Sequence, residues 1–231
     1  MLEIADLTLK YGQSQILNGI TMTAKPGQVT AVMGTNGVGK TSLLKAIAGR
    51  HPYAGGTITL DGTPLDHPSA FHAARAGIAY LPQGREVFPL LSVTENLTTC
   101  FACLPRPEKA IPPRIYELFP VLAEMKDRRG GDLSGGQQQQ LAIARALITK
   151  PRVLLLDEPT EGIQPNIIKQ IGRVIEALRA EGQIAIVLVE QYFDFAYSLA
   201  DEFVALNRGS VVLRDPKAKV DRATLLSRVS I

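Results

Sequence analysis

The sequence predicts an α/β fold with a mainly parallel core sheet and an inserted helical subdomain, and three observations support this class. A glycine-rich loop at residues 34–41 lies between a strand pattern and a helix pattern. Two fully apolar runs of strand length, Val153–Leu156 and Ile184–Val189, flank a helix pattern from about Pro165 to Ala180. Continuous apolar strands that alternate with helices indicate a buried parallel sheet. Helix patterns broken by prolines fill much of residues 84–150, which predicts the helical subdomain.

The first 65 residues are expected to form short strands around one helix. A strand starts with the alternating apolar residues Leu2, Ile4, Leu7 and Leu9. Val29–Met33 is a second strand, and Ser42–Gly49 reads as a helix that ends in glycine. Thr57–Leu60 is a further strand, followed by a turn at Asp61 and Gly62.

The middle and the end of the chain follow different patterns. Helix patterns run from Ser92 to Ala102 and from Ile111 to Met125. Prolines interrupt them at positions 105, 107, 112 and 113. Residues 211–231 are expected to form a short strand and one short helix, which is too small for a regulatory domain.

Composition excludes several classes of protein. The chain has 231 residues, of which 45% are hydrophobic and 20% charged, so it is long enough for one globular domain and is not disordered or collagen-like. No apolar run approaches the roughly 18 residues of a transmembrane helix. The net charge of +3 is too small to imply nucleic acid. Two cysteines cannot form a disulfide framework, which fits a reducing cytoplasm, and the first residues show no secretory signal pattern.

The glycine-rich loop matches the phosphate-loop pattern GxxxxGK[ST] and has the required strand before it and helix after it. Glycines let successive backbone N–H groups point at one anion, and the helix N-terminus adds its positive dipole end. Lys40 would neutralise the charge of the β- and γ-phosphates, and the Thr41 hydroxyl can ligate Mg²⁺. The residues expected to bind the nucleotide here are Gly34, Asn36, Gly37, Gly39, Lys40, Thr41 and Ser42.

A second nucleotide motif follows the apolar strand Val153–Leu156, where Asp157 and Glu158 stand together. Adjacent strand residues point in opposite directions, so the two carboxylates need different roles. Asp157 would hold Mg²⁺ through water, and Glu158 would act as general base for the attacking water. A charged strand end that caps the next helix is the alternative.

Leu133–Gln137 reads LSGGQ and precedes a helix pattern over residues 138–149. A serine and two glycines at a helix start form a second anion site. Two anion sites and one nucleotide in one domain suggest that two chains share two nucleotides. With both preceding motifs in this order and spacing, the chain closely resembles the ATP-binding cassette (ABC) ATPases over nearly its whole length. The phosphate loop alone is less specific, because many kinases and GTPases share it.

This resemblance implies a P-loop NTPase fold in which residues 1–231 form a single nucleotide-binding domain. That domain would contain an antiparallel β subdomain and a helical subdomain at about residues 84–150. Two copies, or this chain and a homologue, would close head to tail around two ATP molecules. Ser134 and Gly136 of one chain would then contact the γ-phosphate held by Lys40 of the other, with Gly135 and Gln137 beside them.

Four further residues gain roles only from the resemblance. Tyr11 would stack on adenine, although a tyrosine that ends a strand can also be ordinary surface. Gln83 would reach Mg²⁺ and the attacking water, and would link the core to the helical subdomain. Gln191 stands where the family often has a histidine that senses the γ-phosphate; glutamine can donate a hydrogen bond but cannot carry that positive charge. Gln164 replaces the aspartate that usually ends the D-loop, so communication across the dimer is expected to differ.

Several phrases narrow the resemblance to one group of ABC proteins. Three segments resemble the group of bacterial importers that takes up branched-chain amino acids and amides: Pro82–Pro89, Thr160–Pro165 and Leu188–Gln191. Leu133–Arg145 together with Gly162–Pro165 is closest to the ATP-binding subunit of the urea importer. Uptake of urea is therefore the first expectation, and branched-chain amino acids or short amides are the alternatives.

Membership of this group implies a set of partners. They are a homologous ATP-binding subunit, two transmembrane permease subunits and a periplasmic substrate-binding protein, with this chain on the cytoplasmic face of the inner membrane. The expected permease contact is an apolar cluster after Gln83, formed by Phe88, Leu90, Leu91 and Val93. Packing of these residues into the helical subdomain's own core is an equal alternative.

Other functions fit less well. Soluble ABC proteins of translation usually fuse two cassettes, and those of DNA repair insert a long coiled coil, whereas this chain has neither. A P-loop kinase would not need LSGGQ or the carboxylate pair. Cys100 and Cys103 form a CxxC, but without a second pair they read as small helix residues rather than as a redox or zinc motif.

Overall fold

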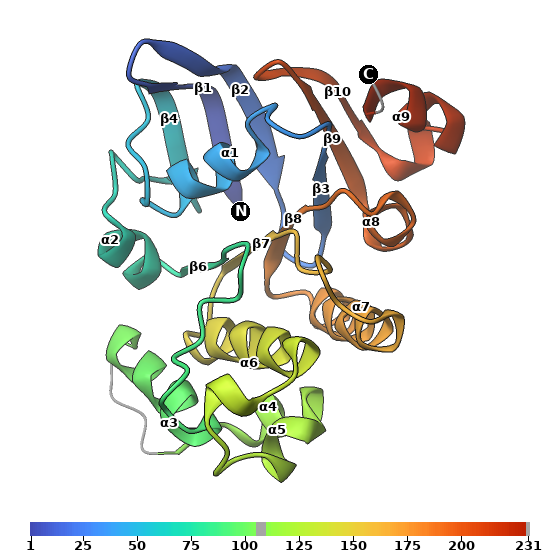
Figure 1. The fold of residues 1–231 in the computed structure, drawn as a ribbon. Coiled ribbons are helices and arrows are strands. Elements are labelled where there is room, and N and C mark those ends of the chain that lie inside the picture. The colour runs from blue at the N-terminus through green and yellow to red at the C-terminus, as the bar shows by residue number, and fades with distance from the viewer. Residues whose placement is uncertain (105–109, 230–231) are drawn as a thin grey trace.

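The structure, a computed structural model, describes residues 1–104 and 110–229 and contains two β-sheets (Figure 1). The central sheet has the strand order β10-β9-β3-β8-β7-β6 and is parallel except between β9 and β10. Its strands are β3 (Val29–Met33), β6 (Ile78–Leu81), β7 (Val153–Asp157), β8 (Ala185–Val189), β9 (Glu202–Asn207) and β10 (Ser210–Pro216). The predicted mainly parallel core is therefore confirmed.

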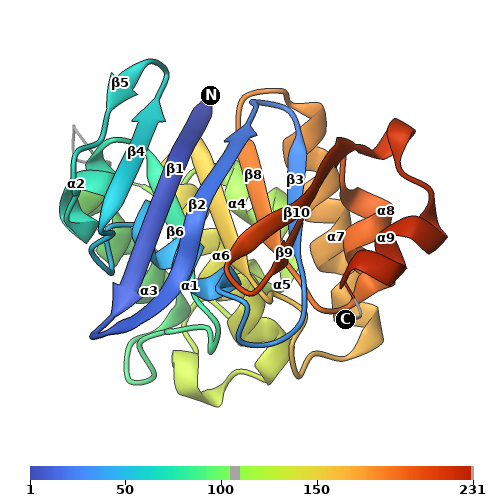
Figure 2. The same cartoon turned by 90° about the horizontal axis from the view of Figure 1, so that it is seen from above.

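The second sheet is antiparallel, in the order β2-β1-β4-β5. Figure 2 shows β4, β1 and β2 side by side, next to β3 of the central sheet. The strands are β1 (Leu2–Tyr11), β2 (Ser14–Ala24), β4 (Gly55–Leu60) and β5 (Thr63–Pro64). The turn expected after Thr57–Leu60 joins β4 to β5.

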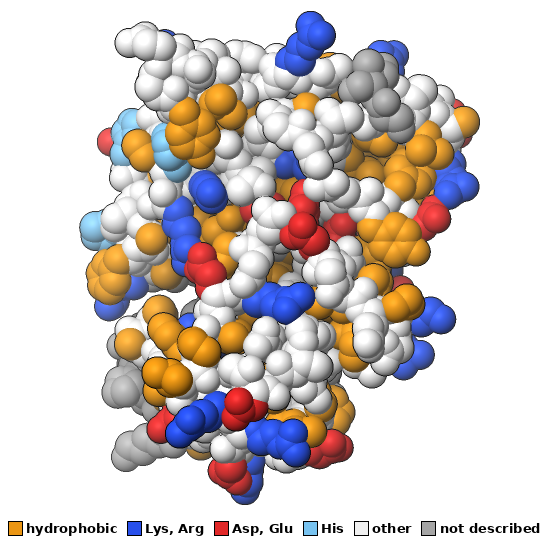
Figure 3. Space-filling model, viewed as in Figure 1, with side chains coloured by type: hydrophobic (Ala, Val, Ile, Leu, Met, Phe, Trp, Pro, Cys, Tyr) orange, Lys and Arg blue, Asp and Glu red, His pale blue; other side chains and the backbone are white. Residues whose placement is uncertain are grey.

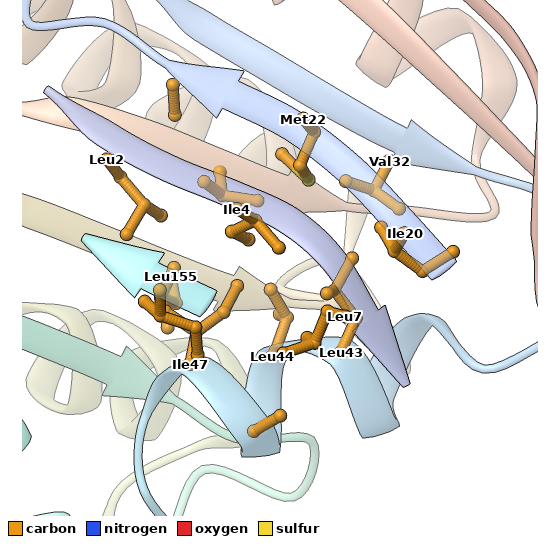
Figure 4. Close-up of a cluster of buried hydrophobic side chains, with 14 of the residues drawn as sticks. Leu2, Ile4, Leu7, Ile20, Met22, Val32, Leu43, Leu44, Ile47 and Leu155 are labelled. Atoms are coloured by element: carbon orange, nitrogen blue, oxygen red, sulfur yellow. The ribbon is translucent and has the colours of Figure 1, made fainter. Parts of the chain in front are cut away.

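The apolar strands β7 and β8 are continuous because both of their faces are buried. In β7, Val153 and Leu155 belong to a core shared with the antiparallel sheet, whereas Leu154 and Leu156 belong to a core shared with helices on the other face. Figure 4 shows part of the first core, to which β1, β2 and α1 (Lys40–Ile47) contribute side chains together with Val32 and Leu155. Strands of a parallel sheet covered on both faces have no exposed side to make polar.

Helix α1 begins two residues earlier than the predicted helix at Ser42, with Gly39 as its N-cap. Its apolar residues Leu43, Leu44 and Ile47 are buried against the antiparallel sheet, and this burial anchors the helix. The phosphate loop is therefore held at both ends, by β3 before it and by α1 after it.

The segment that predicted a helical subdomain lies below the sheets in Figure 1. Its elements are α3 (Val93–Thr98), a 3-10 turn (Thr99–Cys103), α4 (Pro113–Leu118), α5 (Pro120–Glu124), a 3-10 turn (Gly130–Asp132) and α6 (Gly135–Ile148). The predicted helix at 92–102 ends early, in the first 3-10 turn. The predicted helix at 111–125 is two helices, because Pro120 has no N–H to continue the first one. Pro105 and Pro107 lie outside the described residues.

The other helices are α2 (Ala70–Arg75), α7 (Pro165–Ala180), α8 (Phe193–Leu199) and α9 (Arg222–Val229), with a 3-10 turn at Lys217–Lys219. Helix α7 has the predicted bounds, and the final strand and helix are present as β10 and α9. Sequence patterns did not identify α2, β2, β6, α8 and β9 individually. Over the described residues, no helix is long and apolar enough to cross a membrane.

Candidate functional site

A cavity of about 520 Å³ lies where β3, β7 and β8 end, at the carboxyl edge of the parallel strands. Open α/β sheets bind ligands at this edge. Its walls contain most of the residues proposed from the three nucleotide motifs and the family resemblance. The lining residues are Tyr11, Ile16, Asn36, Gly37, Gly39, Lys40, Thr41, Ser42, Gln83, Glu158, Glu161 and Gln191.

Lys40 is buried in its own loop, where its ammonium donates to the carbonyl oxygens of Gly34 at 2.8 Å and Thr35 at 2.9 Å. Burial lowers the pKa of Lys40, while the nearby carboxylates of Glu158 and Asp157 oppose that shift. Gly39 has a φ of 105°, and a Cβ there would come within 2.6 Å of the Leu17 side chain. The loop therefore needs glycine at this position to bring the lysine to the cavity.

Asp157 ends β7 and lies behind Thr41, fully buried. Its carboxylate accepts hydrogen bonds from the Thr41 hydroxyl at 3.1 Å and from the Tyr80 hydroxyl at 2.9 Å. Burial raises the pKa of Asp157, and these two hydrogen bonds oppose the shift. A carboxylate kept in a buried position beside a phosphate loop is suited to a cation.

Glu158 leaves the strand in a left-handed conformation, with a φ of 49°. This conformation is rare for residues other than glycine and is a feature of functional sites. The N–H of Glu158 donates to the carbonyl of Val189 at 2.9 Å, and Asp157 pairs with Val189 in the parallel register. The kink turns the Glu158 side chain into the cavity, whereas Asp157 stays behind Thr41.

Two glutamine amides reach Glu158. Gln191 donates from Nε2 to one carboxylate oxygen at 2.6 Å, and Gln83 donates to the other at 3.2 Å. The same Gln83 nitrogen donates to Glu161 at 2.8 Å. The structure thus brings together three residues that are 75 and 33 positions apart in the chain. In this arrangement Gln83 is engaged with carboxylates of the cavity.

The oxygen groups beside the phosphate loop are suitable ligands for Mg²⁺. Thr41 and Asp157 offer a hydroxyl and a carboxylate oxygen within hydrogen-bond distance of each other. Hard oxygen ligands of this kind suit Mg²⁺, which usually keeps several waters and binds one or two protein groups plus phosphates. The hydrogen bonds of Gln83 in this structure go to Glu158 and Glu161 rather than to this pair.

Tyr11 lies at the edge of the cavity, with 41% of its surface exposed. Its ring meets the His51 ring edge-on at 4.3 Å between centroids. An exposed aromatic face at the mouth of a phosphate-binding cavity leaves room for a base to stack.

The LSGGQ segment lies outside this cavity, at the start of α6. Ser134 is exposed and caps the helix: its hydroxyl accepts from the N–H of Gln137, and the Gln137 side chain accepts from the N–H of Ser134. The glycines are packed closely, since a Cβ would lie 2.7 Å from Arg85 at Gly135 and 2.8 Å from Ile167 at Gly136. The two predicted anion sites are therefore separate in one chain.

Three residues of the site region were missed by sequence reasoning. Tyr80 holds Asp157, Glu161 holds Gln83, and Glu190 is a buried carboxylate next to Gln191. Glu190 directly precedes Gln191, and Glu161 lies three positions after Glu158, but nothing in their local pattern indicated a contact. Tyr80 lies on β6, a four-residue strand that sequence patterns did not reveal.

The fold and the cavity define a class of protein: a P-loop nucleotide-binding domain with a mainly parallel core and an antiparallel β-sheet. Comparison with known proteins gives the family. The sequence profile described as ABC transporter matches residues 17–161, and the chain belongs to that family. Its fold is the ABC ATPase fold, and the chain is an ABC-type ATPase coupled to transport.

Three similar proteins illustrate the relationship. The high-affinity branched-chain amino acid transport ATP-binding protein BraG of Pseudomonas aeruginosa is 39% identical over 219 residues, which cover 94% of each chain. The sulfate/thiosulfate import ATP-binding protein CysA of Escherichia coli is 33% identical, and the match covers 96% of this chain but 61% of CysA. The ATP-binding cassette MJ0796, in a dimeric post-hydrolysis state with ADP and Pi, superposes with a TM-score of 0.83 at 22% identity, over 94% of this chain and 99% of that one.

Proposed function

We propose that this chain is the ATP-hydrolysing motor subunit of a bacterial importer, acting in a head-to-tail dimer of cassettes. The observation that carries the proposal is the cavity that Lys40, Thr41 and Glu158 line, with Gln191 bonded to Glu158. Asp157 lies directly behind Thr41. Phosphate-binding groups and a candidate base thus share one site. The exposed Ser134 lies elsewhere on the chain, where a partner's nucleotide can reach it.

Each residue of the cavity has a distinct proposed role. Lys40 would exchange its two loop carbonyls for phosphate oxygens, which are better acceptors because they are charged. Mg²⁺ bound beside Thr41 and Asp157 would neutralise phosphate charge. Glu158 would accept the proton of the attacking water. Gln191 would hold Glu158 in place and donate to the γ-phosphate.

Gln83 has to change partners in this scheme. In this structure its amide bridges Glu158 and Glu161. Reaching Mg²⁺ or the attacking water would free the Glu158 carboxylate at the same time. We therefore propose that the segment after β6 moves when nucleotide binds. That movement would link the cavity to the helical segment at about residues 84–150, which we propose acts as one subdomain.

The dimer is supported by the separation of the two anion sites within one chain. MJ0796, which shares the fold, is dimeric in a post-hydrolysis state bound to ADP and Pi. Tyr11 would stack on the adenine of the nucleotide held by its own chain. Ser134, with the backbone of Gly135, Gly136 and Gln137, would bind the γ-phosphate held by the partner.

The permease contact is proposed on the surface that follows Gln83. Phe88 is 46% exposed and Leu90 is 78% exposed, so both can meet a partner. Leu91 is half-buried, and Val93 is fully buried in the core around α3 and α6. Val93 is therefore a core residue, and the proposed surface keeps Phe88 and Leu90. Figure 3 shows hydrophobic side chains at the surface in the region where Figure 1 places α3.

The transported solute is proposed from similarity. BraG, by its name a branched-chain amino acid transport protein, covers nearly the whole chain at 39% identity, which supports branched-chain amino acids over urea. Urea remains the second candidate, on the phrases Leu133–Arg145 and Gly162–Pro165. The complex would contain two permease subunits and a periplasmic substrate-binding protein, with this chain on the cytoplasmic face of the inner membrane.

Parallel uptake assays test both the importer role and the identity of the transported solute. Labelled leucine and labelled urea would be supplied to source cells that carry Lys40→Ala in this chain. Selective loss of leucine uptake supports the amino acid importer, and selective loss of urea uptake moves the chain to the urea branch. If both persist at the native rate, the importer proposal is wrong for these solutes, and co-purification with membrane proteins would identify the actual partner.

A further inference from the structure

Glu190 is a buried carboxylate that the scheme above leaves without a role. It follows β8 directly and is 2% exposed. Burial raises its pKa, even though hydrogen bonds to Thr160, Tyr192 and Gln191 oppose the shift. A charge held in so dry a place costs stability, so its contacts show what it is kept for.

The two oxygens of Glu190 serve two different segments. Oε1 accepts from the N–H of Thr160 at 3.1 Å and from the Thr160 hydroxyl at 2.5 Å. Oε2 accepts from the N–H of Gln191 at 2.9 Å and from the N–H of Tyr192 at 3.0 Å. One carboxylate therefore joins the turn after β7 to the segment after β8.

Both joined segments carry a cavity residue. Glu158 lies two positions before Thr160, and Gln191 follows Glu190 directly. Between them the Gln191 amide donates to Glu158 at 2.6 Å, and the N–H of Glu158 donates to Val189 at 2.9 Å. Glu190 thus completes a ring of contacts that runs from Glu158 through Thr160, Glu190 and Gln191 back to Glu158. It holds both chain segments that carry the cavity residues.

We propose that Glu190 is a positioning residue for hydrolysis, which holds the Gln191 backbone so that the Gln191 amide stays on Glu158. This inference rests on the roles proposed above for Glu158 and Gln191. A carboxylate suits the task because it accepts all four bonds. A glutamine has one acceptor oxygen and two N–H donors, so one of the two segments would face a donor instead.

The test is a double-mutant cycle on the purified full-length chain. Glu190→Gln is expected to lower kcat for ATP hydrolysis on the order of 10- to 100-fold, the range for displaced supporting groups, with ATP affinity little changed. In a Gln191→Ala background the same substitution is expected to cost much less, because the amide it positions is gone. Equal fold losses in both backgrounds, or no loss with Gln191 present, would overturn the inference.

A second variant guards against misfolding of Glu190→Gln. Thr160→Val removes only the hydroxyl donor, so it should lower kcat by a smaller factor than Glu190→Gln does. Thr160→Ser keeps the hydroxyl and should therefore keep the native rate. If valine and serine behave alike, Glu190 does not work through Thr160 and the ring of contacts is wrong.

Hydrogen exchange on the nucleotide-free chain gives a readout that needs no turnover. Glu190→Gln should speed exchange of the Gln191 and Tyr192 amides while distant strands keep their protection; unchanged exchange would contradict the proposal. The ATPase activity of Glu158→Gln, measured alongside, distinguishes the proposed base role of Glu158 from the positioning role of Glu190. If Glu158→Gln hydrolyses normally, the proposed base is wrong. If it is inactive and Glu190→Gln is normal, only the positioning role fails.

Discussion

The phosphate-loop cavity and the LSGGQ segment both offer groups for the same phosphate, but the chain builds them in opposite ways. The cavity collects residues from the phosphate loop, from α1 and from the segments that follow β6, β7 and β8. Its side chains already hydrogen-bond one another, as Gln191 does with Glu158. The LSGGQ segment is capped by hydrogen bonds between Ser134 and Gln137, within four residues, and its serine stays exposed.

This difference shows which half can be complete within one chain. The cavity has its lysine, its carboxylates and its glutamines in place, so the fold alone assembles it. LSGGQ has a helix N-terminus and an exposed hydroxyl that caps it, and none of its residues lines the phosphate cavity. Substitutions in the first region should therefore act on one chain, and those in the second should act only when two chains meet.

Lys40→Ala should have the broadest effect, because it impairs both nucleotide binding and turnover in the cavity. Loss of a buried cation aimed at phosphate should lower ATP turnover on the order of 10²–10³-fold and weaken ATP binding by the single chain. Steady-state phosphate release and a nucleotide titration measure the two effects. Lys25→Ala, an exposed lysine outside the cavity, is the control and should leave both values unchanged.

Glu158→Gln should separate binding from chemistry within the same cavity. Removal of a general base typically costs 10²–10⁴-fold, while the amide keeps the size of the side chain, so we expect ATP to bind without turnover. The variant should then accumulate an ATP-bound dimer, visible by size-exclusion chromatography. Native hydrolysis by Glu158→Gln would contradict its assignment. Glu176→Gln, on the exposed face of α7, is the matched control.

Ser134→Ala tests the LSGGQ segment against a control, because a second helix has the same kind of serine cap. Ser134 and Ser92 each close a capping box, at the starts of α6 and α3. Either alanine variant should cost about 1 kcal/mol of unfolding free energy. Only Ser134→Ala should also lower ATPase activity, and it should leave ATP binding by the single chain intact. Equal ATPase activity in the two variants would mean that the exposed hydroxyl does not meet a nucleotide.

The smallest expected effect is a pH dependence of stability that arises at Glu190. Its pKa is raised above 4.5 in the folded protein, so the folded state holds this proton more tightly than the unfolded state. The contribution of Glu190 to stability therefore falls as the pH rises from about 4.5 through the folded pKa. Urea unfolding at several pH values should show a flatter dependence in Glu190→Gln. An identical dependence in both proteins would show that the buried charge carries no such cost.

Prediction from sequence succeeded where one local pattern had one explanation. The apolar runs of β7 and β8, the helix α7 and the phosphate loop were all found from periodicity and glycine placement. It failed where context decided: Pro120 split the helix expected over 111–125, and the strand β6 was too short to show a period. Val93, one of four residues proposed for a permease, lies in the core, because an apolar residue near a helix start can face either way.

By itself, the sequence determined the class of fold, the phosphate loop, the carboxylate pair and the capped start of α6, because each depends on residues close together in the chain. Only the tertiary structure decided what surrounds Glu158: the left-handed kink, the amides of Gln83 and Gln191, and Glu190 behind them. These contacts join positions up to 75 residues apart. They are set by the registers of β7 on its neighbours β6 and β8, which no local pattern encodes.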